Sequence, residues 1–229
     1  MNNTPTALLL HTASLFLWDL PLDDRIHLAL DAGLDGVEIS DGPGIVNWQP
    51  HPETVRRLRR HVATVHAELF PEQGITLGVW AEAIARLPIQ WRNAVFHPDE
   101  LGADDFARLA DLPFPASIEN MDPTRDDWRT VDEVRRVLVP GVGLTLDTAH
   151  TEENGLSVES FRPLFIPQEM HLSAAEVDYY DYNHALVHLR PDAPPQVVSG
   201  CPLVTLEGVV PAGGTFLADE VRFVREAIL

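Results

Sequence analysis

The chain has 229 residues, 45% of them hydrophobic, which is enough to bury a sizeable core in one large domain or two small ones. Its 35 acidic and 16 basic residues give a formal charge of −19, which disfavours binding to the phosphate backbone of nucleic acids. Cys201 is the only cysteine, which fits a reducing compartment. No apolar run approaches the roughly 18 residues of a membrane span, and no lysine or arginine precedes Arg25, as one would in a secretory signal. We therefore expect a cytoplasmic protein without a membrane partner.

Taken in chain order, segments with strand and helix patterns alternate from end to end. Short apolar runs bounded by turn residues predict eight strands, at residues 7–10, 36–39, 63–67, 93–96, 116–118, 143–146, 169–172 and 203–206. Amphipathic spacing predicts helices at residues 22–32, 51–61, 75–87, 104–110, 131–139, 158–164 and 218–229. Residues 178–200 have neither pattern and are expected to form loops or irregular structure. The alternation predicts an α/β fold, a single (β/α)8 TIM barrel over residues 1–229, somewhat trimmed because several helices are short.

A carboxylate and a histidine follow the sixth predicted strand directly. In the stretch GLTLDTAH, at residues 143–150, an alternating apolar run ends at Asp147, and His150 comes three residues later. Barrels of this kind place their chemistry at the carboxyl ends of the strands. A carboxylate oxygen and an imidazole nitrogen suit zinc or manganese, so the pair indicates a divalent metal site. The alternative is structural, with Asp147 capping the next helix and His150 packing beside it.

The same arrangement recurs at other strand ends. Eight side chains are predicted to converge on the rim formed by the carboxyl ends of the strands: His66, His97, Glu119, Asp147, His150, His171, His184 and Glu207. Each of them alone has a structural explanation, as a turn residue, a hydrogen-bonded core histidine or a solvated strand end. Chance is a poor account of the set, because six of the eight strands would have to end independently in a good ligand for such cations.

The remaining histidines lack that position. Structural or surface roles are expected for His11, His27, His51, His61 and His188. His11 is the doubtful member, because it follows the first strand. Glu38 ends the second strand and is interpreted as a residue that supports a ligand or contacts substrate, and Asn120 as one that orients a ligand or a substrate hydroxyl.

Five motifs in this chain resemble those of the xylose-isomerase-like barrel superfamily, which includes sugar epimerases and isomerases and endonuclease IV. The resemblance runs from about Leu8 to Glu207 and is strongest in VFHPDEL, SIEN, LDTAH, MHLS and VTLEG. The sugar-epimerase branch implies one divalent ion bound by four residues, Glu119, Asp147, His171 and Glu207. It also implies that Glu119 and Glu207 shuttle a substrate proton and that His150 contacts the substrate.

The endonuclease IV branch implies a different metal content. There, matches to all eight rim residues hold three zinc ions. The branch has Asp-x-His in the loop after strand seven, whereas in this chain Tyr182 stands two residues before His184 and the nearest acid is Asp181. The departure leaves the third metal of that branch without one of its ligands. This chain also lacks obvious long loops for binding DNA.

Three functions are compatible with these residues. The first is a divalent-metal-dependent isomerase or epimerase that acts on a sugar or sugar derivative by proton transfer through an enediolate, with Glu119 and Glu207 on opposite sides of the ion. Its expected ion is zinc or manganese, with magnesium as an alternative, its expected partner is a small-molecule sugar, and its oligomeric state is left open. The second is an endonuclease IV-like multi-zinc phosphoesterase, which explains His66, His97 and His184 better. The third is a non-catalytic metal-binding barrel.

Overall fold

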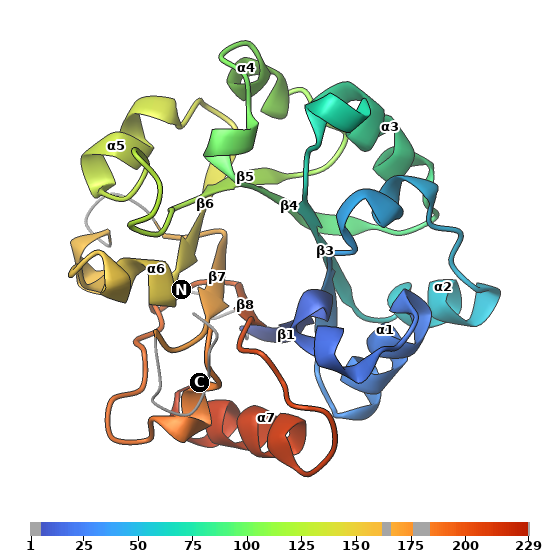
Figure 1. The fold of residues 1–229 in the computed structure, drawn as a ribbon, viewed down its shortest axis with the longest axis vertical. Helices are drawn as coiled ribbons and strands as arrows, with labels where there is room; N and C mark the ends of the chain where they lie inside the picture. The colour runs from blue at the N-terminus through green and yellow to red at the C-terminus, as the bar shows by residue number, and fades with distance from the viewer. Residues whose placement is uncertain (1–5, 162–165, 176–183, 229) are drawn as a thin grey trace.

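The computed structural model describes residues 6–161, 166–175 and 184–228. A closed barrel of eight parallel strands lies at its centre, with each strand hydrogen-bonded to the next and β8 to β1 (Figure 1). The strands are β1 Ala7–His11, β2 Gly36–Ile39, β3 Val62–Ala67, β4 Trp91–Phe96, β5 Ala116–Glu119, β6 Val142–Asp147, β7 Glu169–Leu172 and β8 Leu203–Leu206. The predicted TIM barrel is confirmed, and each predicted strand has its counterpart.

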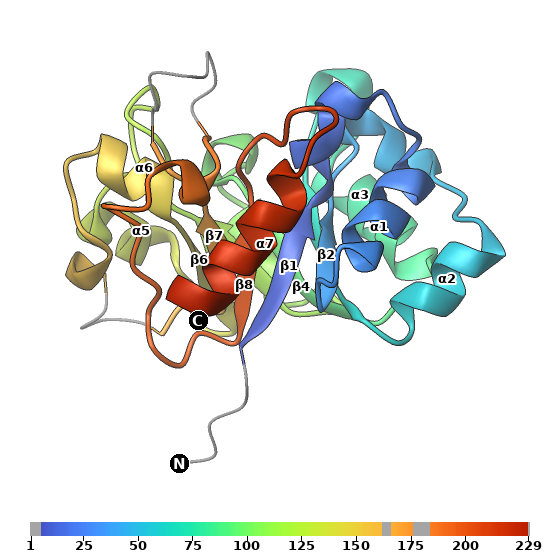
Figure 2. The ribbon, with the colours of Figure 1, turned by 90° about the horizontal axis from the view of Figure 1, so that it is seen from below.

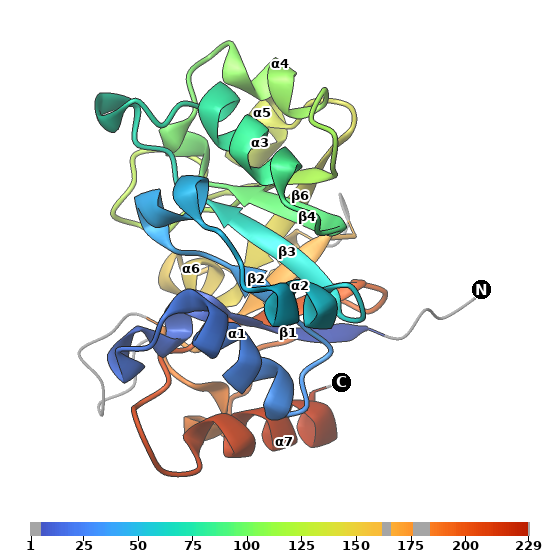
Figure 3. The same ribbon diagram turned by 90° about the vertical axis from the view of Figure 1, so that its right-hand side faces the viewer.

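Helices form an outer layer around the strands (Figures 1 and 3). They are α1 Leu22–Asp31, α2 Pro52–Leu58, α3 Leu77–Arg86, α4 Asp105–Leu109, α5 Val131–Val137, α6 Thr148–Glu153 and α7 Phe216–Ala227. Figure 2 shows α7 on the outside of the barrel, in front of β8. Between β7 and β8 the described residues contain only a short 3-10 turn, Val187–Leu189, so the outer layer is trimmed there, as predicted. No described helix is long and apolar enough to cross a membrane.

The helix predicted at residues 158–164 is wrong in the part that can be compared. Only a 3-10 turn, Val158–Ser160, forms there, and residues 162–165 lie outside the described residues. The helix of this βα unit is α6, which starts immediately after β6 because the Asp147 carboxylate accepts a hydrogen bond from the His150 N–H at 2.6 Å. Gly155, with a φ of 67°, follows its end. Of the predicted loop at 178–200, residues 178–183 also lie outside the described residues.

The interior of the barrel is polar, whereas its outer face is apolar. Alternate strand residues such as Leu8, Val37 and Leu146 face outward and pack in the core beneath the helices. The inward residues contact each other across the barrel: Thr64 on β3 donates a hydrogen bond to Glu169 on β7 at 3.2 Å, although these strands are not neighbours. TIM barrels are commonly filled by branched apolar side chains. The polar side chains that fill this barrel instead lie directly below the carboxyl ends of the strands, where they can support the residues of a site.

The close packing of β2 against β3 provides a test of how these strands are paired. Gly36 lies between Leu9 and Val62, and a Cβ at position 36 would lie 2.0 Å from the Val62 carbonyl oxygen. We therefore expect Gly36→Ala to lower the free energy of unfolding by about 1–3 kcal/mol, because the backbone of the next strand must move. The measurement is urea unfolding followed by circular dichroism.

Gly78→Ala in α3 is the matched control. There a Cβ meets the guanidinium end of Arg108 at 3.3 Å, which can move away, and Thr76 Oγ1 at an ordinary contact distance of 4.0 Å. Gly78 is the second residue of α3, so the substitution is expected to stabilise the protein by at most about 0.4–1 kcal/mol, chiefly because alanine restricts the unfolded chain. Equal unfolding midpoints for Gly36→Ala and the unmodified protein would contradict the strand register.

Candidate metal centre

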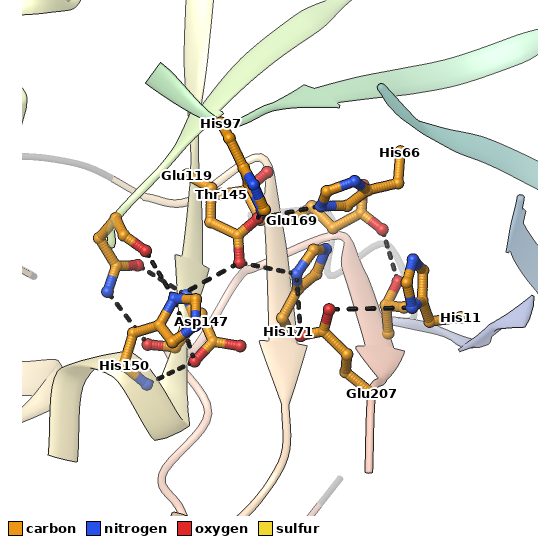
Figure 4. A network of polar contacts seen from close by, with 12 residues as sticks. His11, His66, His97, Glu119, Thr145, Asp147, His150, Glu169, His171 and Glu207 are labelled. Carbon is orange, nitrogen blue, oxygen red and sulfur yellow. Dashed lines mark hydrogen bonds and ion pairs between the residues drawn. The ribbon is translucent and has the colours of Figure 1, made fainter. Parts of the chain in front are cut away.

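Four side chains from consecutive strands form the middle of the rim. Glu119 ends β5, Asp147 ends β6, His171 lies in β7 and Glu207 follows β8 directly. One ligand atom from each lies within 4.8 Å of the others. Figure 4 shows the four side chains pointing toward one another. We call these four residues the central set.

The central set fits a divalent cation. Asp147 Oδ2 and Glu207 Oε2 are buried, and neither has a hydrogen-bond partner among the described residues. Burying a carboxylate oxygen without a hydrogen bond is costly, so each of these oxygens needs a positive charge nearby, which a protonated imidazole or a divalent cation supplies. His171 Nδ1 faces the same space, 3.0 Å from Glu119 Oε1 and 3.3 Å from Glu207 Oε2. Three carboxylates and one imidazole are a ligand group that suits zinc or manganese.

Two flanking sets share a carboxylate with the central set. On the β3 side, His66 Nε2 lies 3.2 Å and His97 Nε2 3.3 Å from Glu119 Oε2. On the α6 side, His150 Nδ1 lies 3.7 Å from Asp147 Oδ1, and His184 Nδ1 lies 3.9 Å from Asp147 Oδ2. The ligand atoms within each flanking set also lie within 4.8 Å of one another. The structure therefore brings all eight predicted rim residues together, in three overlapping sets.

The structure confirms that Asp147 caps α6, and this geometry leaves its second carboxylate oxygen available for a metal. Its Oδ1 caps α6, while Oδ2 remains for the rim. Asn120 orients it, because the Asn120 side-chain oxygen accepts from the Asp147 N–H at 2.7 Å. The Asn120 carbonyl also lies 2.8 Å from His150 Nδ1. A carbonyl can only accept, so Nδ1 carries a proton, and Nε2 is the nitrogen of His150 that would bind a metal.

Carboxylates and imidazoles change each other's proton affinity at the rim. Burial alone would lower the pKa of a histidine, yet the neighbouring carboxylates raise the pKa of His66, His97 and His171, and that of His150 to about 9. Burial raises the pKa of Asp147 to about 6. Protons on the imidazoles thus balance the buried carboxylates, and a divalent ion would displace those protons where it binds.

The contacts of His11 exclude a surface role. It was expected to have a structural or surface role, but it is buried on the rim, 3.7 Å from Glu38 Oε1 and 3.8 Å from Glu207 Oε1. The signal was available, because His11 ends β1 just as the other rim residues end their strands. Glu38 is fully buried, and its two oxygens lie 3.1 and 3.3 Å from His171 Nε2.

Glu169 was not recognised from the sequence. It starts β7 two residues before His171, so it faces inward one layer below the rim. It accepts hydrogen bonds from Thr64 at 3.2 Å and from Asn93 at 2.8 Å, and burial raises its pKa to about 8. The period of two residues from His171 was the signal that could have identified it.

The other predicted residues are placed as follows. His188 lies beside Glu220 of α7 at 2.6 Å, outside the three sets. His27 contacts Thr54, and His51 caps α2. Asp181 and Tyr182, on which the comparison with the endonuclease IV loop depends, lie outside the described residues.

No protein-family model and no curated protein sequence matches the chain, but solved structures match it over nearly its whole length. A D-allulose 3-epimerase from Methylomonas sp. has a TM-score of 0.66 at 12% identity, covering 97% of this chain and 98% of that one. The 3-keto-D-glucoside 4-epimerase from E. coli has a TM-score of 0.62 at 15% identity, covering 96% and 99%. The TTHB071 protein from Thermus thermophilus, soaked with ZnCl2, has a TM-score of 0.58 at 17% identity, covering 98% and 99%. At these identities the likeness is one of fold: the chain shares its TIM barrel with sugar epimerases.

Proposed function

We propose that this protein is a divalent-metal-dependent epimerase or isomerase that acts on a sugar or sugar derivative by proton transfer. The central set carries the proposal, because it combines a site for one cation with two glutamates that reach it from different strands. Glu119 comes from β5 and Glu207 from the end of β8, and both contact His171 Nδ1. The sugar epimerases among the structural neighbours support the choice of substrate class.

The chain's own residues supply the proton transfer. A divalent ion held by the central set would polarise a carbonyl and an adjacent hydroxyl of the substrate, which makes the C–H between them more acidic. Although burial opposes ionisation, His171 and other histidines hold the pKa of Glu119 and that of Glu207 well below the usual range, so both are ionised. One ionised glutamate can remove a proton from one face of the substrate carbon. The other, once it has taken up a proton from water, can return that proton to the opposite face.

The charges around the site favour a neutral sugar. All 16 basic residues of the chain are arginines, so no lysine is present to form a Schiff base with a carbonyl substrate. Arg125, after β5, pairs with Asp99 at 2.7 Å, and Arg190, after β7, pairs with Glu152 at 2.8 Å. The phosphate group of a sugar phosphate would have to compete with Asp99 and Glu152 for these arginines, whereas the hydroxyls of a neutral sugar need no cationic partner.

A second candidate function is favoured by the flanking sets. A single-ion epimerase does not require His66, His97 or His184 as ligands, yet the structure places all three beside the shared carboxylates. Two or three zinc ions in these sets would suit a phosphoesterase, in which ions stabilise both the attacking and the leaving oxygen. The number of ions bound per chain separates the two functions.

Exchange with solvent tests the proton transfer directly. We expect the metal-loaded protein, incubated with neutral ketoses and aldoses in D2O, to incorporate deuterium at a carbon next to the carbonyl, because the proton removed there equilibrates with water. NMR of the recovered sugar is the measurement. Glu207→Gln should reduce incorporation at least about 100-fold, at the low end of what general acid–base catalysis contributes. Failure of every ketose and aldose tried to incorporate deuterium would argue against the epimerase.

The ligand role of Asp147 can be separated from its capping role. Asparagine caps a helix as well as aspartate does but lacks the charge, so Asp147→Asn should retain α6 and lose tight zinc binding. We expect the affinity to fall by more than the roughly 10–100-fold typical of changes outside the ligand shell. Competition with a chromophoric chelator measures it.

Asp23→Asn is the matched control for that experiment. Asp23 accepts hydrogen bonds from Trp48 Nε1 at 3.0 Å and from the His51 N–H at 2.8 Å, away from the rim. Loss of the Asp23 charge should lower the stability of the fold and leave the affinity for zinc unchanged. An Asp147→Asn variant that binds zinc as tightly as the unmodified protein would disprove the central set.

His97→Ala separates the two candidate functions. In an epimerase with one ion, His97 lies outside the central set, so the ion count per chain should stay at one. In a multi-zinc phosphoesterase, His97 would be a ligand together with His66 and Glu119, and its removal should release one ion from a starting value of two or more. Elemental analysis after identical dialysis measures the count. His188→Ala, outside the rim, should leave it unchanged in either case.

A further inference from the structure

Glu38 lies behind the only imidazole of the central set. It is fully buried in β2 and reaches His171 of β7 across the barrel. Its Oε1 and Oε2 lie 3.1 and 3.3 Å from His171 Nε2, on the side of the ring away from Nδ1. His171 therefore has carboxylates at both nitrogens: Glu38 at Nε2, and Glu119 and Glu207 at Nδ1.

We propose that Glu38 is a positioning residue that keeps the proton of His171 on Nε2 and thereby directs the Nδ1 lone pair to the ion of the central set. The proposal rests on the metal centre of the proposed function. A neutral imidazole has one N–H and one lone pair, so the nitrogen that holds the proton decides which one binds a metal. Histidines that bind metals commonly donate their other N–H to a carboxylate, which fixes both the tautomer and the ring orientation.

Glu38 is itself held in place from two sides. Thr64 Oγ1 donates to Glu38 Oε2 at 3.4 Å, and His11 Nε2 lies 3.7 Å from Oε1. Strand pairing fixes these neighbours, because Glu38 is in register with His11 on β1 and with Thr64 on β3. The carboxylate therefore cannot turn away from His171 without breaking contacts to both adjacent strands.

Glu38 is better placed to orient a ligand than to be one. One atom each of Glu38, His66 and His171 also lies within 4.8 Å of the others, so these three could in principle bind an ion of their own. His171 would then have to give Nε2 to that ion and Nδ1 to the central one, which a neutral imidazole with a single lone pair cannot do. The central set also has two unpartnered carboxylate oxygens facing it, Asp147 Oδ2 and Glu207 Oε2, whereas Glu38 contributes only one, Oε1.

The test is Glu38→Gln, which keeps the shape and a hydrogen-bond acceptor but removes the charge. We expect the affinity for Zn²⁺, measured by chelator competition, to fall by about 10–100-fold, with the number of ions per chain unchanged. Glu220→Gln is the matched control, because Glu220 is also a fully buried glutamate beside a histidine, His188 Nδ1 at 2.6 Å, but lies outside the rim. It should leave zinc affinity unchanged.

A second measurement needs no variant and holds even if Glu38→Gln does not fold. Long-range ¹H–¹⁵N NMR of the zinc-loaded, unmodified protein should show His171 with its proton on Nε2 and zinc on Nδ1. The opposite tautomer would overturn the proposal. Unchanged zinc affinity in Glu38→Gln would also overturn it, as would the loss of a whole ion per chain, which would make Glu38 a ligand.

These readouts are independent of the epimerase activity. Zinc affinity and tautomer are measured without substrate, so Glu38 can prove to be a positioning residue even if no sugar incorporates deuterium. Conversely, deuterium incorporation that persists while Glu38→Gln binds zinc normally would retain the epimerase and reject the role of Glu38. No zinc binding by the unmodified protein would reject the metal centre on which both depend.

Discussion

The burial of carboxylates inside the barrel is the constraint on which the rest of this structure depends. Glu38, Glu119, Asp147 and Glu169 are each at most 1% exposed. An unpaired carboxylate in such a place is costly, so each must be compensated by protons, donors or cations. The compensation has two levels: imidazoles surround the carboxylates at the rim, whereas the hydroxyl of Thr64 and the amide of Asn93 donate to Glu169 below it.

Closure of the sheet makes this compensation available. A parallel barrel brings all eight strand ends to one rim, and its inward side chains meet partners on strands that are not neighbours. Glu38 and His171 are 133 residues apart and come from β2 and β7, yet they are in contact. The outward residues form the hydrophobic core with the helices, so the stability of the fold does not depend on apolar side chains inside the barrel. Stability and chemistry are thus assigned to opposite faces of the same strands.

The sequence predicted the parts of the structure that depend on local pattern. The alternation of strand and helix patterns predicted the eight strands, and the acids and histidines at the strand ends predicted the convergence of the rim residues. That convergence follows because a closed parallel barrel brings all carboxyl ends of its strands to one rim. Asp147 as the cap of the next helix was one of two interpretations, but the six residues of α6 have too little apolar spacing to be recognised as a helix, and the helix was predicted further along the chain. Nor did the sequence assign Glu169 and His11 to the interior, although His11 ends β1 and Glu169 stands two residues before His171, because only closure of the barrel brings their polar partners on other strands near them.

The way in which two carboxylates are shared explains why the site is compatible with two functions. Glu119 turns Oε1 toward His171 and Oε2 toward His66 and His97, so it belongs to the central set and to one flanking set at once. Asp147 likewise belongs both to the central set, with Glu207 and His171, and to the flanking set with His150 and His184. With one ion in the centre, the flanking imidazoles keep their protons and remain hydrogen-bond donors, which suits the hydroxyls of a neutral sugar. With further ions, the same imidazoles lose those protons and become ligands. The two functions therefore differ in how many imidazole protons at the rim are replaced by metal ions. The geometry of the barrel is common to both.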